Sequence, residues 1–165
     1  MENLAKAVRE GYVLVDPEAG DLRDVLLQVV SMCAANGIIS VEQQPAVLQE
    51  LLDRQQRVPT ATGRGVAIPH AYMEGIAEPV IAIVRLKRPI DMGAPDGMPT
   101  RLLFVLLGPS GDLNGHIDTV TTIWRLVTDK DVMGFARRGQ SRTSAGRFRT
   151  TRSELPSDQV LQRQR

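Results

Sequence analysis

Two histidines, His70 and His116, are the side chains in this sequence best suited to nucleophilic chemistry. His70 ends the segment 60–70, TATGRGVAIPH, in which a glycine-punctuated loop leads into the apolar run 66–68 and then into Pro69. Because proline lacks an amide donor and fixes its own φ, we expect the strand to end there and to present His70 from a rigid corner at the sheet's rim. A neutral imidazole is nucleophilic near neutral pH, and its second nitrogen can be held by a hydrogen bond. The pattern therefore favours a nucleophilic histidine.

A histidine that accepts a phosphoryl group needs neighbours that balance the added negative charge. The guanidinium of arginine binds phosphoryl oxygens through two parallel hydrogen bonds. The candidates for this role are Arg54 at the end of a predicted helix, Arg64 in the loop, and the second imidazole, His116. The spacing of Arg54 is equally consistent with a solvated helix end.

Other site chemistries have little support in the sequence. The two histidines are 46 residues apart and have no carboxylate at ligand spacing, which argues against a metal site. Ser110 lies in GPSGD, which lacks the nucleophile-elbow pattern. The Gly63–Gly65 segment has no third glycine or following helix, so it is not a dinucleotide fingerprint, and no Walker-type phosphate loop is present. We therefore expect no metal, nucleotide or other cofactor.

Two amphipathic helices are predicted ahead of the His70 segment. Asp21 is suited to cap the first, whose apolar stripe spans 22–33, and Asn36-Gly37 provides the left-handed residue that ends it. Ser40 is expected to cap the second helix, whose apolar face ends near Arg54. Two such helices in sequence are expected to cover a sheet.

The strands are predicted by two nearly continuous apolar runs, 80–86 and 101–107, which are typical of central strands covered on both faces. Asp96-Gly97 between them favours a hairpin turn. The loop 108–115 leads into His116 and into a helix with apolar residues at 120, 123, 124 and 127. Both histidines then fall on loops or element ends at one rim. The sequence predicts an α/β fold with a mixed β-sheet sandwiched by helices.

Composition indicates one globular domain with an aliphatic core. The 165 residues are 42% hydrophobic but only 4% aromatic, and this scarcity argues against single-stranded nucleic-acid binding. Cys33 is the one cysteine, which excludes an internal disulfide, and its place in an apolar helical run predicts a core residue. No run has membrane-spanning length and no signal-peptide pattern is present, so we expect a cytoplasmic protein.

The net charge of +1 hides an uneven distribution. Residues 137–165 carry eight arginines against Glu154 and Asp158, a net of +6, whereas the rest of the chain carries −5. We expect residues 1–136 to form the folded domain and residues 137–165 to be a basic C-terminal segment, partly or wholly disordered. Because this segment lacks an apolar face, a solubilising end is favoured over a nucleic-acid or membrane contact.

The segment 51–70, LLDRQQRVPTATGRGVAIPH, resembles the active-site region of the enzyme IIA domain of the fructose/mannitol/nitrogen-regulatory type, from the bacterial phosphoenolpyruvate-dependent phosphotransferase system. The family pattern is Arg-Glu, a short spacer, Ser-Thr-Gly, and then Gly-x-Ala-x-Pro-His. The matching positions here are Arg54, Thr60, Gly65, Ala67, Pro69 and His70. The run 95–109 followed by His116 is similar to the family's strand and second histidine, and the similarity extends from about residue 5 to about residue 135.

The resemblance implies the enzyme IIA fold and a phosphotransferase component. His70 would accept a phosphoryl group from a phosphohistidine on HPr or nitrogen-type HPr and pass it to an enzyme IIB or a regulatory target, with no metal or nucleotide. His116 would stabilise the phosphorylated imidazole, and Arg54 would balance its charge. The residues expected on the binding side of the site are Thr60, Gly65 and Arg64. As no IIB or IIC segment is found here, a nitrogen-type regulatory role is favoured over dedicated sugar uptake; a catalytically silent interaction or sensor module with the same fold is the alternative.

The sequence departs from the family pattern near the predicted site. Gln55 stands where the family usually has glutamate, and Pro59 and Ala61 replace the serine and glycine that flank Thr60. Ile117 replaces a leucine after the second histidine. These changes leave the phosphate-handling residues in place, and we expect them to alter loop shape and partner choice. The basic C-terminal segment is a larger departure, because the family ordinarily ends in an amphipathic helix.

Overall fold

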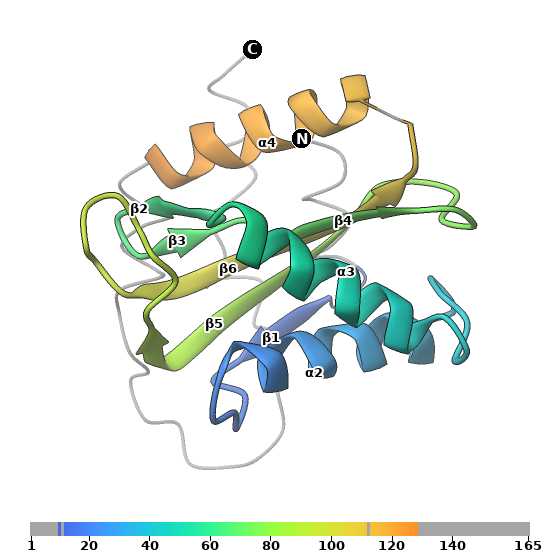
Figure 1. Cartoon of the computed structure of the whole chain (residues 1–165), viewed down its shortest axis with the longest axis horizontal. Coiled ribbons are helices and arrows are strands. Elements are labelled where there is room, and N and C mark those ends of the chain that lie inside the picture. The colour runs from blue at the N-terminus through green and yellow to red at the C-terminus, as the bar shows by residue number, and fades with distance from the viewer. Residues whose placement is uncertain (1–9, 11, 112, 129–165) are drawn as a thin grey trace.

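The computed structural model describes residues 10, 12–111 and 113–128 (Figure 1). The predicted basic segment 137–165 lies outside the described residues, so its expected disorder is not tested. The described elements, in chain order, are β1 (Val13–Val15), α2 (Leu22–Ala35), α3 (Gln44–Arg57), β2 (Ala61–Gly63), β3 (Val66–Ala67), β4 (His70–Met73), β5 (Val80–Ile90), β6 (Thr100–Pro109) and α4 (Leu113–Thr128). None of these helices is long and apolar enough to cross a membrane.

The strands form one six-stranded mixed sheet with the order β1-β5-β6-β3-β2, and β4 also pairs with β6. The two long apolar runs are its centre: β5 and β6 pair antiparallel, and the connection 91–99 between them contains a turn centred on residues 95–96, one position before the predicted Asp96-Gly97. β1 runs parallel to β5, and β3 and β4 both run parallel to β6. β3 and β4 therefore share one edge of β6, which brings the chain past the site in an extended conformation.

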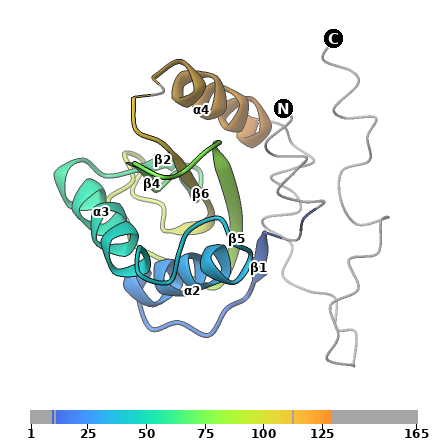
Figure 2. The same ribbon diagram turned by 90° about the vertical axis from the view of Figure 1, so that its right-hand side faces the viewer.

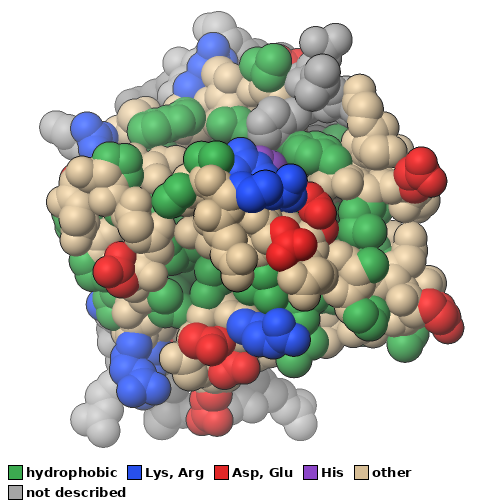
Figure 3. Space-filling view, in the orientation of Figure 1, with side chains coloured by type: hydrophobic (Ala, Val, Ile, Leu, Met, Phe, Trp, Pro, Cys, Tyr) green, Lys and Arg blue, Asp and Glu red, His purple; other side chains and the backbone are tan. Residues whose placement is uncertain are grey.

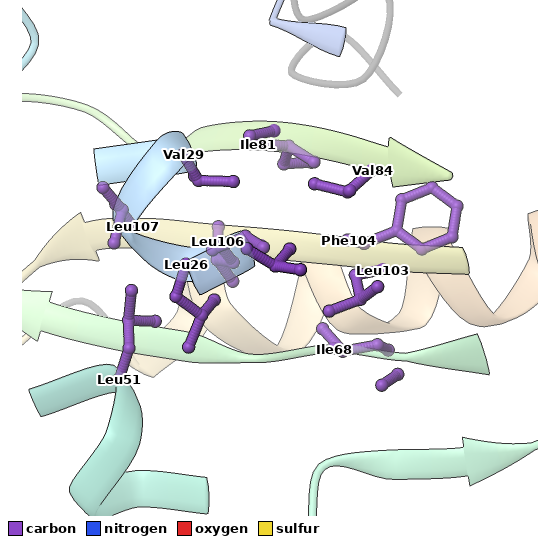
Figure 4. Packing of buried hydrophobic residues seen from close by; sticks show 14 of the residues in the cluster. Leu26, Val29, Leu51, Ile68, Ile81, Val84, Leu103, Phe104, Leu106 and Leu107 are labelled. Carbon is purple, nitrogen blue, oxygen red and sulfur yellow. The ribbon is translucent and has the colours of Figure 1, made fainter. Parts of the chain in front are cut away.

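Helices cover both faces of the sheet, which confirms the predicted fold class. Figure 2 shows α2 and α3 on one side of the sheet and α4 on the other. The core between them is almost wholly aliphatic (Figure 4), with Leu26 of α2, Leu51 of α3 and Leu106 of β6 each no more than 1% exposed. Cys33 is buried in the same core, and this burial raises the pKa of its thiol to about 11. The prediction that Cys33 is a core residue is confirmed.

The two early helices differ in how well the sequence predicted their starts. Asp21 caps α2 as predicted, since its carboxylate accepts a hydrogen bond from Asp24 N at 2.9 Å. Ser40, by contrast, caps a separate turn: its hydroxyl accepts from Gln43 N at 3.3 Å, and the Gln43 side chain accepts from Ser40 N at 2.8 Å. α3 begins only at Gln44, with Pro45 in its first turn, where proline's missing N–H costs no helical hydrogen bond. The predicted cap was therefore wrong.

The end of the sheet and the start of α4 also depart from the prediction. β6 continues through Pro109 and α4 begins at Leu113, so the predicted loop 108–115 is much shorter. Ile123 and Val127 are buried against the sheet, whereas Trp124, which was counted with them among the apolar residues of the predicted helix, is 43% exposed. Trp124 lies at the margin of the apolar stripe, where a rotation of the helix by a fraction of a turn decides burial.

Candidate active site

His70 is the first residue of β4 and lies within the sheet, not on a loop beyond it. Its backbone pairs with Leu106 of β6, and the carbonyl of Pro69 accepts a hydrogen bond from Leu106 N at 2.9 Å. Pro69 interrupts the strand because it has no amide donor, yet its carbonyl keeps the chain attached to β6. The strand that precedes Pro69 ends before it as predicted, and His70 does lie at an element end, but the separate strand β4 that begins at His70 was not predicted.

Two hydrogen bonds define the protonation of the His70 ring. Nδ1 lies 2.9 Å from the carbonyl oxygen of Ile68, and Nε2 accepts from Nε of Arg54 at 3.1 Å. A carbonyl can only accept and a guanidinium can only donate, so the proton is on Nδ1 and the lone pair is on Nε2. The partly buried ring is thus a neutral imidazole whose Nε2 is the nucleophilic atom.

Arg54 lies in the last turn of α3, which places its side chain over His70. Besides its bond to Nε2, its Nη1 donates to the carbonyl of Val58 at 3.3 Å. The ion pairs among the described residues join Arg57 to Glu50 and Arg85 to Asp16, so the guanidinium of Arg54 has no carboxylate partner there. Figure 3 shows Lys/Arg surface directly in front of a small area of histidine surface. The geometry favours a charge-balancing Arg54 over a solvated helix end.

Thr60 supports the His70 corner from behind. Its backbone carbonyl accepts from Ile68 N at 3.0 Å, and its amide and hydroxyl both donate to the side-chain oxygen of Gln55, the amide at 3.0 Å. Thr60 is buried, at 8% exposure. Thr60 therefore does not contact the imidazole itself in these hydrogen bonds. It binds the backbone of Ile68, whose carbonyl lies against His70 Nδ1.

Gly65 and Arg64 lie in the turn between β2 and β3, at the opposite end of the folded segment from Thr60 and His70. The register pairs Val66 with Leu102 and His70 with Leu106, so the two ends are about 13 Å apart along β6 at 3.3 Å per residue. Arg64 is exposed, and its backbone N–H donates to the carboxylate of Asp96 at 2.7 Å. No described contact brings Arg64 or Gly65 to the imidazole, so their binding role stays a prediction.

The second predicted histidine, His116, lies in the first turn of α4. Its side chain is outside the described residues, so its pairing with His70 also stays a prediction. Within the part of the chain that the structure describes, no group of three His, Cys, Asp or Glu side chains is placed to hold a metal ion.

Two further residues beside His70 were missed by the sequence analysis. The Tyr72 ring lies 5.9 Å from the His70 ring at an interplanar angle of 57°, because residues two apart on a strand share a face. Gly108 pairs with Tyr72, and a Cβ on Gly108 would lie 2.9 Å from Cε1 of the tyrosine ring. Strand alternation would have revealed Tyr72 if β4 had been predicted; the need for glycine at 108 has no local sequence signal.

A mixed sheet between helix layers, with an arginine on the nucleophilic nitrogen of a neutral histidine, defines a site suited to phosphoryl transfer onto histidine. The family model described as "Phosphoenolpyruvate-dependent sugar phosphotransferase system, EIIA 2" matches residues 6–142, and the chain belongs to this family. The predicted family is confirmed.

Similar proteins agree with this assignment. The nitrogen regulatory protein of Pseudomonas aeruginosa is 30% identical over 132 residues, which cover 80% of this chain and 84% of that protein. The crystal structure of the nitrogen regulatory protein IIA-Ntr from Neisseria meningitidis superposes with a TM-score of 0.69 at 24% identity, covering 78% and 86% of the two chains. Mannitol enzyme IIA from Escherichia coli, in complex with phosphorylated enzyme IIB, superposes with a TM-score of 0.63 at 16% identity, covering 79% and 88%. These two structures show the shared fold.

Proposed function

We propose that this protein is a phosphohistidine carrier in which Nε2 of His70 accepts a phosphoryl group from a phosphohistidine on HPr or nitrogen-type HPr. It then passes the group to an enzyme IIB or to a regulatory target protein. The observation that carries the proposal is the pair of contacts on one ring: Arg54 at 3.1 Å from Nε2 and the Ile68 carbonyl at 2.9 Å from Nδ1.

The transfer step needs neither a metal nor a nucleotide, because the donor is already an activated phosphoramidate. The lone pair of His70 Nε2 forms a bond to phosphorus while the phosphorus–nitrogen bond of the donor breaks, and the donor imidazole leaves as a neutral ring. His70 keeps its Nδ1 proton, so its ring becomes cationic, and the Ile68 carbonyl stabilises that charge. No net proton is released when the donor ring likewise keeps its own N–H.

Arg54 contacts His70 Nε2 before the transfer and would stabilise the phosphoryl group after it. Its guanidinium already lies at the nitrogen that would bear the phosphoryl group, so a small movement from Nε2 onto the phosphoryl oxygens would balance their charge. Phosphoryl transfer depends almost entirely on alignment and on electrostatic stabilisation of the planar group in transit. The proposed transfer therefore depends chiefly on the orientation of the His70 imidazole and the Arg54 guanidinium.

For the recipient, we propose a nitrogen-type regulatory target ahead of a sugar-specific enzyme IIB. The support is the Pseudomonas aeruginosa relative, which is named a nitrogen regulatory protein. The mannitol enzyme IIA structure, solved with phosphorylated enzyme IIB, supports the alternative recipient. Phosphoenolpyruvate is a cytoplasmic metabolite, so the proposed relay would operate in the cytoplasm.

Incubation with enzyme I, HPr and labelled phosphoenolpyruvate tests the proposal, with standard and nitrogen-type HPr in separate reactions. We expect the full chain to take up label that is acid-labile and base-stable, and His70→Ala to take up none. His116→Ala tests the second histidine, for which we expect uptake with a shorter lifetime of the label. A full chain that stays unlabelled with both donors would overturn the proposal in favour of a catalytically silent module.

A further inference from the structure

Gln55 follows Arg54 in the last turn of α3, and both the oxygen and the nitrogen of its side-chain amide form hydrogen bonds. Oε1 accepts from the backbone N–H of Thr60 at 3.0 Å and from the Thr60 hydroxyl, while Nε2 donates to the carbonyl of Met92 at 3.3 Å. A backbone N–H only donates and a carbonyl only accepts, so the partners fix which end of the amide is which. A carboxylate at this position could accept both bonds from Thr60 but could not donate to Met92.

The bonds of Gln55 continue to the imidazole of His70. The Thr60 carbonyl accepts from Ile68 N at 3.0 Å, and the Ile68 carbonyl holds His70 Nδ1 at 2.9 Å. Ile68 is only 4% exposed, so its carbonyl is held by packing as well as by this network. Arg54 approaches the same ring from the Nε2 side. Consecutive residues of one helical turn thus reach the two ring nitrogens by separate routes.

The other end of the amide joins the site to the connection 91–99 between β5 and β6. Met92 is 4% exposed and anchors that connection in the core. Gln55 is the described side chain that links this connection directly to Thr60. Loss of the amide would therefore release the backbone behind His70 on two sides.

We propose that Gln55 is a positioning residue that fixes the orientation and the tautomer of His70 through Thr60 and Ile68. The inference rests on the proposed function only in taking His70 as the phosphoacceptor. The arrangement of the ring is a property of the unphosphorylated protein, so it can be measured without any phosphoryl transfer.

The direct test is nitrogen-15 NMR of the histidine rings in the unphosphorylated full chain, above the pH at which imidazole is protonated. His70 is distinguished from the other histidine by the spectrum of His116→Ala. We expect the wild-type His70 ring to carry its proton on Nδ1, and Gln55→Ala to show both tautomers. Gln55→Glu keeps both acceptor bonds to Thr60 and is expected to keep the Nδ1–H tautomer. Gln56→Ala, at the adjacent and exposed glutamine, is the matched control.

The same variants are then compared in the labelling reaction. A displaced imidazole is expected to slow phosphoryl acceptance by Gln55→Ala on the order of tenfold to a hundredfold, with Gln56→Ala unchanged. We expect Gln55→Glu to lie between them, because it keeps both acceptor bonds to Thr60 but cannot donate to the carbonyl of Met92.

Unchanged tautomer and rate in folded Gln55→Ala would overturn the inference. If that variant does not fold, Thr60→Val decides, because it removes the hydroxyl donor to Gln55 and must also populate the second tautomer; Thr60→Ser must restore the wild-type spectrum. A failure of the proposed function would instead appear as unlabelled wild-type protein with a normal His70 spectrum.

Discussion

The segment 60–70 folds back on itself, and the open end of this fold, at Thr60 and His70, and its turn, 63–65, are held by different parts of the molecule. At one end, Thr60 and His70 are bound by the last turn of α3 through Gln55 and Arg54. At the other end, the turn 63–65 is bound by Asp96, whose carboxylate accepts from Arg64 N at 2.7 Å and from Met98 N at 3.1 Å. The first end carries His70, the proposed phosphoacceptor, and the second end joins the turn 63–65 to the connection 91–99.

This difference shows why a glycine-rich turn beside a basic residue is weak evidence for a phosphate site. Backbone N–H groups in such a turn can bind an anion, but here the described donor at Arg64 is already used by the carboxylate of Asp96. Arg64 itself has φ +57°, a left-handed conformation that serves the turn. The anion bound by this turn is therefore the carboxylate of Asp96, a group of the protein itself. The guanidinium of Arg54, in contrast, has no carboxylate partner among the described residues.

Arginine substitutions at the two ends give the largest expected contrast. Arg54→Ala removes the donor at His70 Nε2, and we expect phosphoryl acceptance to fall by about 10²- to 10³-fold, the usual cost of losing one preorganised charge-stabilising donor. Arg64→Ala is expected to stay within about twofold of wild type, because its charge lies far along the sheet. Initial rates of label uptake at saturating donor measure both. Equal losses in the two variants would contradict the separation of the two ends.

Arg57→Ala serves as the matched control for Arg54→Ala within the same helical turn. Arg57 is exposed and bonds to Glu50 at 2.9 Å, so its loss changes net charge equally without touching His70. We expect a near-normal rate, since an exposed ion pair contributes little.

Gly108→Ala tests the His70 end from the neighbouring strand β6, on the same face of the sheet as Tyr72 and His70. The new methyl group would lie 2.9 Å from the Tyr72 ring, so the ring must move away from its place beside His70. We expect a destabilisation of about 1–3 kcal/mol, typical of overpacking, and a slower labelling rate. Urea unfolding measures the first effect. In a Tyr72→Leu background the added cost of Gly108→Ala should shrink, and an unchanged cost would show that Tyr72 is not the obstacle.

Much of the helix and strand arrangement could be predicted, because the sequence patterns that indicate these elements are local. The continuous apolar runs of β5 and β6 and the apolar stripe of α2 reflect burial on both faces or on one face, and burial is encoded residue by residue. β4 was missed because it is short and follows Pro69, whose missing amide suggested an end to the strand. The Ser40 cap was misplaced because its hydroxyl can close a turn as readily as it can start a helix.

For the candidate site, the sequence predicted the types of side chain that the chemistry requires, but not the residues that position them. Histidine as nucleophile required a cation, and Arg54 was a candidate on those grounds before any contact was known. The roles of Gln55 and Gly108 depend on partners 37 and 36 residues away, Met92 and Tyr72 respectively, which no local pattern reveals. The position of Gln55 relative to Met92, and of Gly108 relative to Tyr72, is set by the tertiary structure. A local sequence pattern therefore cannot predict it.

Asp96→Asn gives the smallest expected effect and tests the structural end alone. The backbone N–H groups of Arg64 and Met98 hold the pKa of the Asp96 carboxyl below its usual range. A carboxyl with a lowered folded-state pKa stabilises the fold above its unfolded-state pKa, and that stabilisation is lost as the pH falls through the folded-state value. The variant should therefore be slightly less stable than wild type at neutral pH, and the difference should vanish in acid. Urea unfolding at neutral and acidic pH measures it, while the labelling rate should not change; a large loss of labelling would mean that the turn 63–65 contributes to the site after all.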